Sequence, residues 1–459
     1  MLRDAIRSWD PKGRPVTERC MATTIKLQDG NEFKGRSGVG INRTALVALQ
    51  TINGNDMWIA PAEAVDERNK PYAQAKAKPQ NNGRNYDHAS YALDWLSLAA
   101  GYALQKSANW SKPIFNSEWH GASTDGWRDE RMSAAYITAS VWTGLYHGEA
   151  MNMAWYFPRS NFTTTRGTGF DNGFAGSFAT QPLATDTFLR AFMTATAHGP
   201  CVAALGRVRP RVWILRSWPS FAANLNATAD LLGAFEPASF LGVGVGFLFE
   251  EQLGAGAAAV SEGDVVLVAG STHAADGTVD WLRRRAISSP GTVAVVTNPN
   301  ATSAGAQLLY TPPGNLRPPS AVAFLLTLPR VELHSARGAL AGMAAVPGIA
   351  ALASAVPARC AEAGHPAGAP AFGILCKFAV YEGRTRGLAI NLGVAAAEVA
   401  IVGPATAALA HGGAFRAAAV TAVDVLTGVQ QSLQPGRTLN LQSSQVLLLD
   451  LGPALAPKI

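Results

Sequence analysis

The sequence has little that would hold a metal ion or carry redox chemistry. Its 459 residues include four cysteines, and none of them belongs to a CxxC pair. A zinc cage and a dithiol motif are therefore not expected, and the eight histidines are too dispersed to suggest a metal site. Only Cys360 and Cys376 are close enough in sequence to suggest a local disulfide. We expect no cofactor.

Charged residues are also scarce, at 15% of the chain. The formal net charge is +6, but arginine and lysine are scattered, and the densest groups, 207–211 and 283–285, hold three arginines each. Nucleic-acid-binding domains usually carry a basic stripe, which this sequence lacks. Short basic groups are typical of solvated faces or domain junctions, so no nucleic-acid partner is expected.

Long apolar segments are missing as well. Crossing a bilayer takes about 20 apolar residues, and every run of that length here is interrupted by glycine, proline or charge, with 338–357 coming closest. We expect a soluble chain without a membrane partner. The amino terminus lacks the apolar core of a signal peptide, although five glycosylation sequons would permit a secreted longer form, so the compartment stays open. The sequons begin at Asn42, Asn109, Asn161, Asn226 and Asn300.

What the sequence does contain is enough apolar material for more than one core. Hydrophobic residues make up 48% of the chain, which is typical of globular proteins, and the length predicts two or three domains. Eight of the 11 tryptophans fall within the first 200 residues. This asymmetry and the changes in pattern predict domains at 1–200, 201–312 and 313–459.

Strands and helices alternate in the first domain, which predicts parallel β/α units. The expected strands are 15–24, 56–60, 113–116 and 150–157, and the expected helices are 43–50, 86–105 and 127–146. The four units correspond to half of a (β/α)8 barrel. A polar stretch at 62–84 has the composition of a loop that could line a cleft.

Four apolar strands and two helices follow, which predicts a small doubly wound α/β layer. The strands are 212–215, 243–249, 265–269 and 292–297, with helices at 221–235 and 277–285. Gly242, Gly244 and Gly246 suggest a dinucleotide loop, but Phe247 or Phe249 stands where the last glycine is needed. Glycines that allow close packing fit the pattern better. The sequence therefore lacks the phosphate-binding loop that a nucleotide-dependent oxidoreductase would need.

The last domain returns to short strands with glycine and proline between them, which predicts an antiparallel β-sandwich. The expected strands are 322–328, 374–381, 386–391, 398–402 and 445–451. The alanine content of 339–355 also indicates a helix, against its internal glycine and proline residues.

The most informative segment for chemistry surrounds Glu118. A short strand runs into Asn116-Ser-Glu-Trp-His120, and the carboxyl ends of strands face the active site in parallel β/α barrels. A carboxylate flanked by Trp119 and His120 suits attack on an anomeric carbon through a glycosyl ester. The other interpretation is a salt-bridged glutamate at a loop entry.

Aromatic residues near the ends of two other strands would extend the same site. Trp155 and Tyr156 end the next strand, and Asp56 and Trp58 lie on an earlier one. An indole can stack on the C–H face of a pyranose, although core packing is the alternative for each ring. His147 and Glu149 precede their strand, so we expect them on the far, stabilising side of a barrel and away from catalysis.

The run from 112 to 159 resembles strands seven and eight of a clan A glycoside hydrolase. The order of parts that follows is similar to the β-galactosidases whose TIM barrel precedes a flavodoxin-like "trimerisation" domain and a small β-sandwich. Arg211-Val-Trp-Ile-Leu215 and Asp264-Val-Val-Leu-Val-Ala-Gly270 resemble that middle domain, and Val423-Asp-Val-Leu-Thr-Gly428 resembles the sandwich. The resemblance implies a retaining hydrolase of β-galactosides, Glu118 as nucleophile, a carbohydrate substrate and a homo-oligomer formed through the middle domain.

The sequence also departs from that family. Its opening resembles the helix after strand four, so the first half of the barrel, with the family's acid/base glutamate, is not visible. A retaining mechanism needs a second carboxyl roughly 5 Å from the nucleophile. The local candidates, without a family position behind them, are Glu18, Asp56, Glu63 and Asp125. The departure leaves three explanations: a fragment, completion by another chain, or a non-catalytic carbohydrate-binding or assembly protein.

Overall fold

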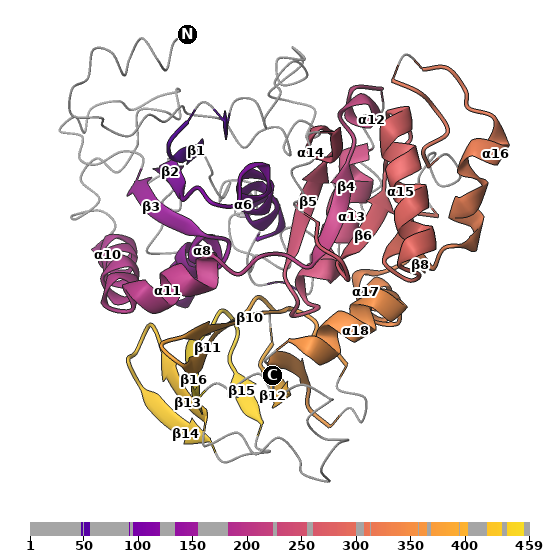
Figure 1. Ribbon diagram of the computed structural model, residues 1–459. Coiled ribbons are helices and arrows are strands. Elements are labelled where there is room, and N and C mark those ends of the chain that lie inside the picture. The colour runs from indigo at the N-terminus through magenta and orange to yellow at the C-terminus, as the bar shows by residue number, and fades with distance from the viewer. Residues whose placement is uncertain are drawn as a thin grey trace, which may run out of the picture.

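The computed structural model places three units side by side (Figure 1). In Figure 1 a small parallel sheet with its helices, coloured indigo to magenta, lies beside a larger parallel α/β layer, and the antiparallel strands in yellow lie below both. The structure describes residues 47–48, 50–55, 91, 95–119, 134–154, 182–223, 227–254, 260–299, 307–312, 314–356, 358–364, 369–393, 395–402, 420–433 and 438–453.

The first unit is a three-stranded parallel sheet in the order β1-β2-β3. Its strands are β1 (Asn53–Asn55), β2 (Ile114–Trp119) and β3 (Glu149–Ala154). Helix α6 (Leu96–Ala108) precedes β2, and α8 (Ala134–Tyr146) lies between β2 and β3. The predicted β/α alternation is confirmed for these elements, whereas the expected strands at 15–24 and 56–60 lie outside the described residues.

Helices cover one face of this sheet. Ile114 of β2 packs with Leu98 and Tyr102 of α6 in a buried cluster. Helix α8 is buried from Tyr136 to Tyr146, because helices α10 (Pro182–Ala197) and α11 (Gly199–Gly206) pack against it. A helix buried along its whole length is apolar all round, which explains why its sequence shows little amphipathic pattern.

The second unit is a five-stranded parallel sheet in the order β5-β4-β6-β7-β8. Its strands are β4 (Val212–Arg216), β5 (Val245–Phe249), β6 (Val265–Ala269), β7 (Val293–Thr297) and β8 (Arg330–Glu332). Helices cover both faces, so the central strands are continuous apolar runs. Its longer helices are α13 (Ala227–Ser239), α15 (Asp276–Ser288), α17 (Ala336–Ala344) and α18 (Pro347–Ala355), and its short ones are α12 (Trp218–Ala223) and α14 (Glu250–Gly254).

In this unit the structure confirms four predicted strands and contradicts a fifth. The four predicted strands match β4 to β7, but the predicted strand at 322–328 is wrong, because this segment forms α16 (Pro319–Val322) and the 3-10 helix η2 (Ala323–Thr327). Pro318 and Pro319 favour a helix start. The fifth strand, β8, lies beyond residue 312, where the sequence predicted the unit to end.

Gly246, the second residue of β5, serves packing, as the sequence indicated. A β-carbon on Gly246 would lie 2.8 Å from Pro210 Cγ and 2.9 Å from Ser107 Oγ. Ser107 belongs to α6, and its hydroxyl accepts a hydrogen bond from the backbone N–H of Phe247 at 2.9 Å. The close approach therefore joins the first unit to the second.

The third unit consists of two antiparallel sheets that share one core. One sheet has the order β10-β11-β16-β13-β14 and the other β15-β12-β9. The strands are β9 (Arg359–Glu362), β10 (Ile374–Tyr381), β11 (Arg384–Asn391), β12 (Ala397–Val402), β13 (Val420–Asp424), β14 (Gln430–Leu433), β15 (Leu439–Leu441) and β16 (Val446–Pro453). The predicted disulfide is confirmed: Cys360 on β9 is bonded to Cys376 on β10 and links the two sheets.

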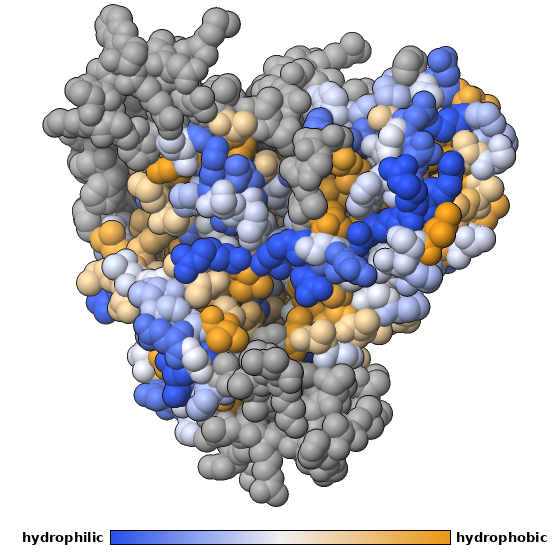
Figure 2. All heavy atoms as spheres, in the orientation of Figure 1, coloured by the Kyte–Doolittle hydropathy of each residue, from blue (hydrophilic) through white to orange (hydrophobic). Residues whose placement is uncertain are grey.

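A basic connection crosses the molecule between these units. In Figure 2 a hydrophilic band runs across the middle of the visible face, along the path that the chain takes from α11 to β4 in Figure 1. Two arginines of this connection, Arg209 and Arg211, form ion pairs at 2.5 and 2.6 Å with Asp264, whose side chain is fully buried. These ion pairs fix the connection to the start of β6 in the second unit.

No single helix of the described residues is long and apolar enough to span a bilayer. Helices α17 and α18 reach the length and composition together, but they meet at an angle of 79°. Their existence confirms the helical prediction for 339–355, and the break falls at Pro347, where the sequence interrupts its alanine run.

Candidate active site

Strand pairing brings the carboxyl ends of β1, β2 and β3 to one edge of the first sheet. Asn55 at the end of β1 is the register partner of Asn116 on β2, and Asn116 is the partner of Asn152 on β3. Further along, Trp119 pairs with Ala154. Because all three strands are parallel, their carboxyl ends lie together, and Glu118 belongs to the central strand.

Strand β2 changes register just before this edge. Two of its residues, Ser117 and Glu118, lie between Asn116 and Trp119, whereas a single residue, Met153, separates their partners on β3. Such an extra residue is a β-bulge, a feature common beside active sites because it breaks the alternation of side chains along the strand.

Asn116 points to the helix-covered face of the sheet. Its side chain is completely buried, and Nδ2 donates a 2.8 Å hydrogen bond to the hydroxyl of Tyr102 on α6. Burial together with the nearby charge of Glu149 holds the pKa of Tyr102 well above its usual value, so the phenol keeps its proton. Through this hydrogen bond Asn116 connects β2 to α6 near the carboxyl end of the strand.

Tyr102 continues this network to Glu149, the first residue of β3. The Tyr102 hydroxyl and the Glu149 carboxyl share a hydrogen bond, and Nδ2 of Asn152 donates to Oε1 of Glu149. Burial raises the pKa of Glu149 to about 8, against the opposing effect of these hydrogen bonds. At neutral pH the carboxyl is therefore largely protonated.

The amino-terminal ends of the same strands border a cavity of about 540 Å³. Glu149, Lys106 and Arg207 supply its titratable groups, and most of the remaining lining comes from apolar residues of α10 and α11. Burial lowers the pKa of Lys106 to about 8, and its ammonium donates to the carbonyl of Lys112 at 2.9 Å. Glu149 lies on this side of the sheet, away from the edge that holds Glu118, as the sequence predicted.

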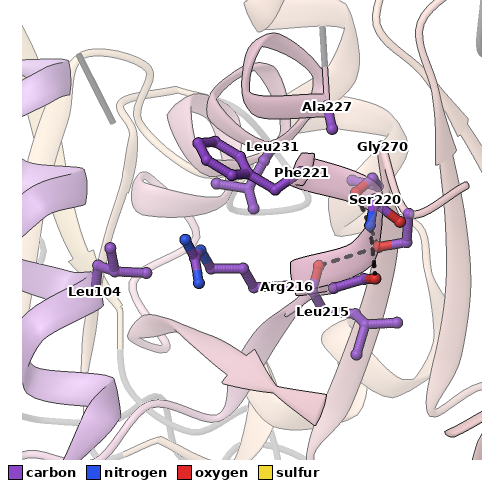
Figure 3. A pocket seen from close by; sticks show the side chains of 11 residues that line it. Leu104, Leu215, Arg216, Ser220, Phe221, Ala227, Leu231 and Gly270 are labelled. Carbon is purple, nitrogen blue, oxygen red and sulfur yellow. Dashed lines mark hydrogen bonds between the residues drawn. The ribbon is translucent and has the colours of Figure 1, made fainter. Parts of the chain in front are cut away.

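The second parallel sheet offers a different concave place, between the carboxyl ends of β4 and β6, where doubly wound folds bind ligands. Figure 3 shows Arg216 reaching toward Leu104 there, with Ser220 and Gly270 at the far wall. The cavity measures about 20 Å³, which is room for about one water molecule. Trp218, Phe221 and Phe249 surround the guanidinium at 5.3 to 5.4 Å. This space does not fit a nucleotide.

The structure describes only part of the predicted site. Asn116 and the backbone of Glu118 and Trp119 are described, and Asn116 is buried beneath the strand end. Asp56, Trp58, His120, Trp155 and Tyr156, together with the side chains of Glu118 and Trp119, lie outside the described residues, as do all four acid/base candidates. Among the residues that the structure describes, no group of three or more His, Cys, Asp or Glu side chains could hold a metal ion.

The sequence alone does not reveal the buried network of Tyr102, Asn116, Glu149 and Asn152. Tyr102 falls within the predicted helix 86–105, where nothing marks it as a polar contact. The signal available was a glutamate at the start of a buried strand, which needs polar partners wherever it is buried.

The fold matches solved glycoside hydrolases over almost the whole chain. It is similar to an exo-carrageenase of family GH42 from Bacteroides ovatus, with a TM-score of 0.67, 18% identity, and coverage of 98% of this chain and 54% of that one. It is also similar to a cold-adapted β-galactosidase from Rahnella sp. R3, with a TM-score of 0.61 and 10% identity, and the match covers 98% of this chain and 66% of that one. For a β-galactosidase from Bacillus circulans sp. alkalophilus the TM-score is 0.52 and the identity 10%, and the match covers 98% of this chain and 65% of that one.

These likenesses show a shared fold, and the chain spans about half to two thirds of the length of the matched structures. No protein-family model matches the sequence. No curated protein matches it either.

Proposed function

We propose that this chain is a retaining glycoside hydrolase-like protein of the GH42 type, which acts on β-galactoside-type carbohydrate with Glu118 as nucleophile. The observation that carries the proposal is the position of Glu118, at the carboxyl end of the central strand in a parallel sheet whose fold is that of GH42 structures. In this proposal β1, β2 and β3 are strands six, seven and eight of a TIM barrel. The parallel layer is the flavodoxin-like domain of that family.

The remaining predicted residues would form the sugar site around Glu118. Trp58, Trp155 and Tyr156 offer stacking surfaces, and Asp56, Trp119 and His120 offer polar contacts. Asn116 has a different role in this proposal, because its amide is buried against Tyr102. It supports the strand that carries the nucleophile.

Because no acid/base residue is assigned, the proposal is tested with a substrate whose leaving group does not need protonation. General acid catalysis contributes about 10²–10⁴ in rate, and it is needed for leaving groups that must be protonated. A 2,4-dinitrophenyl β-galactoside needs no such help, so the chain should release dinitrophenol from it even without an acid. Added azide should then accelerate turnover by attacking the glycosyl-enzyme, and Glu118→Gln should abolish both effects.

Three results separate the alternatives. Dinitrophenol release that azide accelerates supports the proposal. Hydrolysis of unactivated galactosides as well would mean that an acid/base is present in the chain. Galactoside binding without any release, by calorimetry, would instead favour a non-catalytic carbohydrate-binding or assembly protein.

We also propose that the parallel layer mediates self-association into a homo-oligomer. The support is a set of large apolar side chains on its surface, in which Ile287 and Leu326 are each 73% exposed and Leu316 is 67% exposed. Sedimentation of the wild type and of Leu326→Glu tests this. An oligomer that the substitution dissociates supports the proposal, and a wild-type monomer at micromolar concentration contradicts it.

A further inference from the structure

A chain of buried side chains links the amino-terminal end of β3 to the strand that carries Glu118. It runs from Asn152 to Glu149, from Glu149 to Tyr102, and from Tyr102 to Asn116. Asn116 lies two positions before Glu118, directly ahead of the β-bulge. The link thus ends at a buried side chain of β2 two positions before Glu118.

The surroundings of Glu149 are built for an uncharged carboxyl. Its side chain is 4% exposed, and its hydrogen-bonding partners are a phenol and an amide. Among the described residues no ion pair joins a lysine, arginine or histidine to it. A buried ionised carboxylate without a cation is costly, whereas a protonated one only needs its hydrogen bonds satisfied.

Helix α8 leaves space for this carboxyl. Residue 144 on α8 is a glycine, and any β-carbon there would overlap Glu149 Oε2. The cavity at the amino-terminal ends of the strands gives solvent protons a route to the group. The titratable groups around it are Tyr102 and Lys106 from α6, His147 after α8, and Arg207 across the cavity.

We propose that Glu149 is a positioning residue, which acts as a neutral carboxylic acid and holds the end of β2 in place through Tyr102 and Asn116. Its relevance to catalysis rests on the proposed role of Glu118, whereas its effect on β2 does not. A raised pKa of about 8 agrees with this state near neutral pH.

Hydrogen exchange of the β2 amides, residues 114–119, tests the proposal without any need for activity. Glu149→Leu and Tyr102→Phe should each speed exchange there by about tenfold, the factor expected for one lost hydrogen bond. Glu149→Gln, a neutral isostere, should stay close to wild type. The matched control is Tyr146→Phe, which removes another buried hydroxyl, bonded to the Cys376 carbonyl.

Wild-type exchange across 114–119 in both Glu149→Leu and Tyr102→Phe would overturn the proposal, as would a Glu149→Gln variant as disturbed as Glu149→Leu. A labelling assay with a 2-fluorogalactoside separates this inference from the proposed function. If the wild type is not labelled, the role of Glu118 fails while the exchange data still decide the role of Glu149. If it is labelled, Tyr102→Phe should slow labelling about tenfold.

Discussion

Gly144 and Glu149 fit together as a pair: a β-carbon at position 144 would occupy the space of Glu149 Oε2. A side chain at residue 144 would therefore require the Glu149 carboxyl to move from its position between α8 and β3. Neither residue belongs to the predicted site, yet their fit places the helix and the strand that frame β2.

Replacing Gly144 by alanine should destabilise the fold by about 1–3 kcal/mol, because the added methyl group displaces a packed carboxyl. Urea unfolding measures the change. In a Glu149→Ala background the same substitution should cost much less, since the space is then vacant, and a double-mutant cycle reports the coupling. Equal costs in both backgrounds would contradict the fit.

The bond between Cys360 and Cys376 closes a loop with a sequence separation of 16 and joins the two antiparallel sheets. Serine at both positions should lower the free energy of unfolding by about 3 kcal/mol, the value expected from the loss of loop-closure entropy. The control is Cys201→Ser, because Cys201 is a free thiol. The prediction fails if reduction of the wild type leaves the urea midpoint unchanged.

Lys377 gives the fold a pH dependence of known sign. The ammonium lies 4.2 Å from the centre of the Tyr146 ring and donates to the Tyr146 carbonyl, at the contact between α8 and β10. Burial lowers the pKa of Lys377 from 10.5 to about 7. Between these values the folded chain binds fewer protons than the unfolded chain, so stability rises with pH.

Lys377→Met should remove this contribution, which amounts to at most about 1.4 kcal/mol per pH unit. The measurement is urea unfolding of both proteins between pH 7 and 10, and the difference isolates Lys377 from other groups. We expect the variant to be the more stable at pH 7 and its advantage to shrink as pH rises. A constant difference across the range would show that Lys377 stays charged in the fold.

Local patterns were sufficient to predict much of the fold. Short apolar runs rich in valine predicted β4 to β7, because β-branched residues favour strands that are buried on both faces. The 322–328 segment misled because its apolar run gives no period, and only the preceding prolines pointed to helix. The short strands β9, β13, β14 and β15 were not predicted. Strand β15 pairs with the distant β12, whereas β14 forms a hairpin with the neighbouring β13 but has a mostly polar sequence that gives no strand pattern.

Glu118 could be proposed as a site residue from the sequence because it follows directly on a short predicted strand, and the carboxyl ends of strands face the active site in parallel β/α barrels. The Tyr102–Glu149 contact joins residues from a helix and a strand whose approach depends on tertiary packing, so the sequence around either residue could not reveal it.

The most direct test of the account is to identify the residue that a mechanism-based inhibitor labels. The chain is incubated with 2-deoxy-2-fluoro-β-galactosyl fluoride, digested, and its peptides are sequenced by mass spectrometry, with Glu118→Gln and Glu149→Gln as paired controls. We predict one fluorogalactosyl unit on Glu118 in the wild type and in Glu149→Gln, and none in Glu118→Gln. A label on another carboxylate, or no label on a chain that cleaves the dinitrophenyl galactoside, would contradict the assignment of Glu118 as nucleophile.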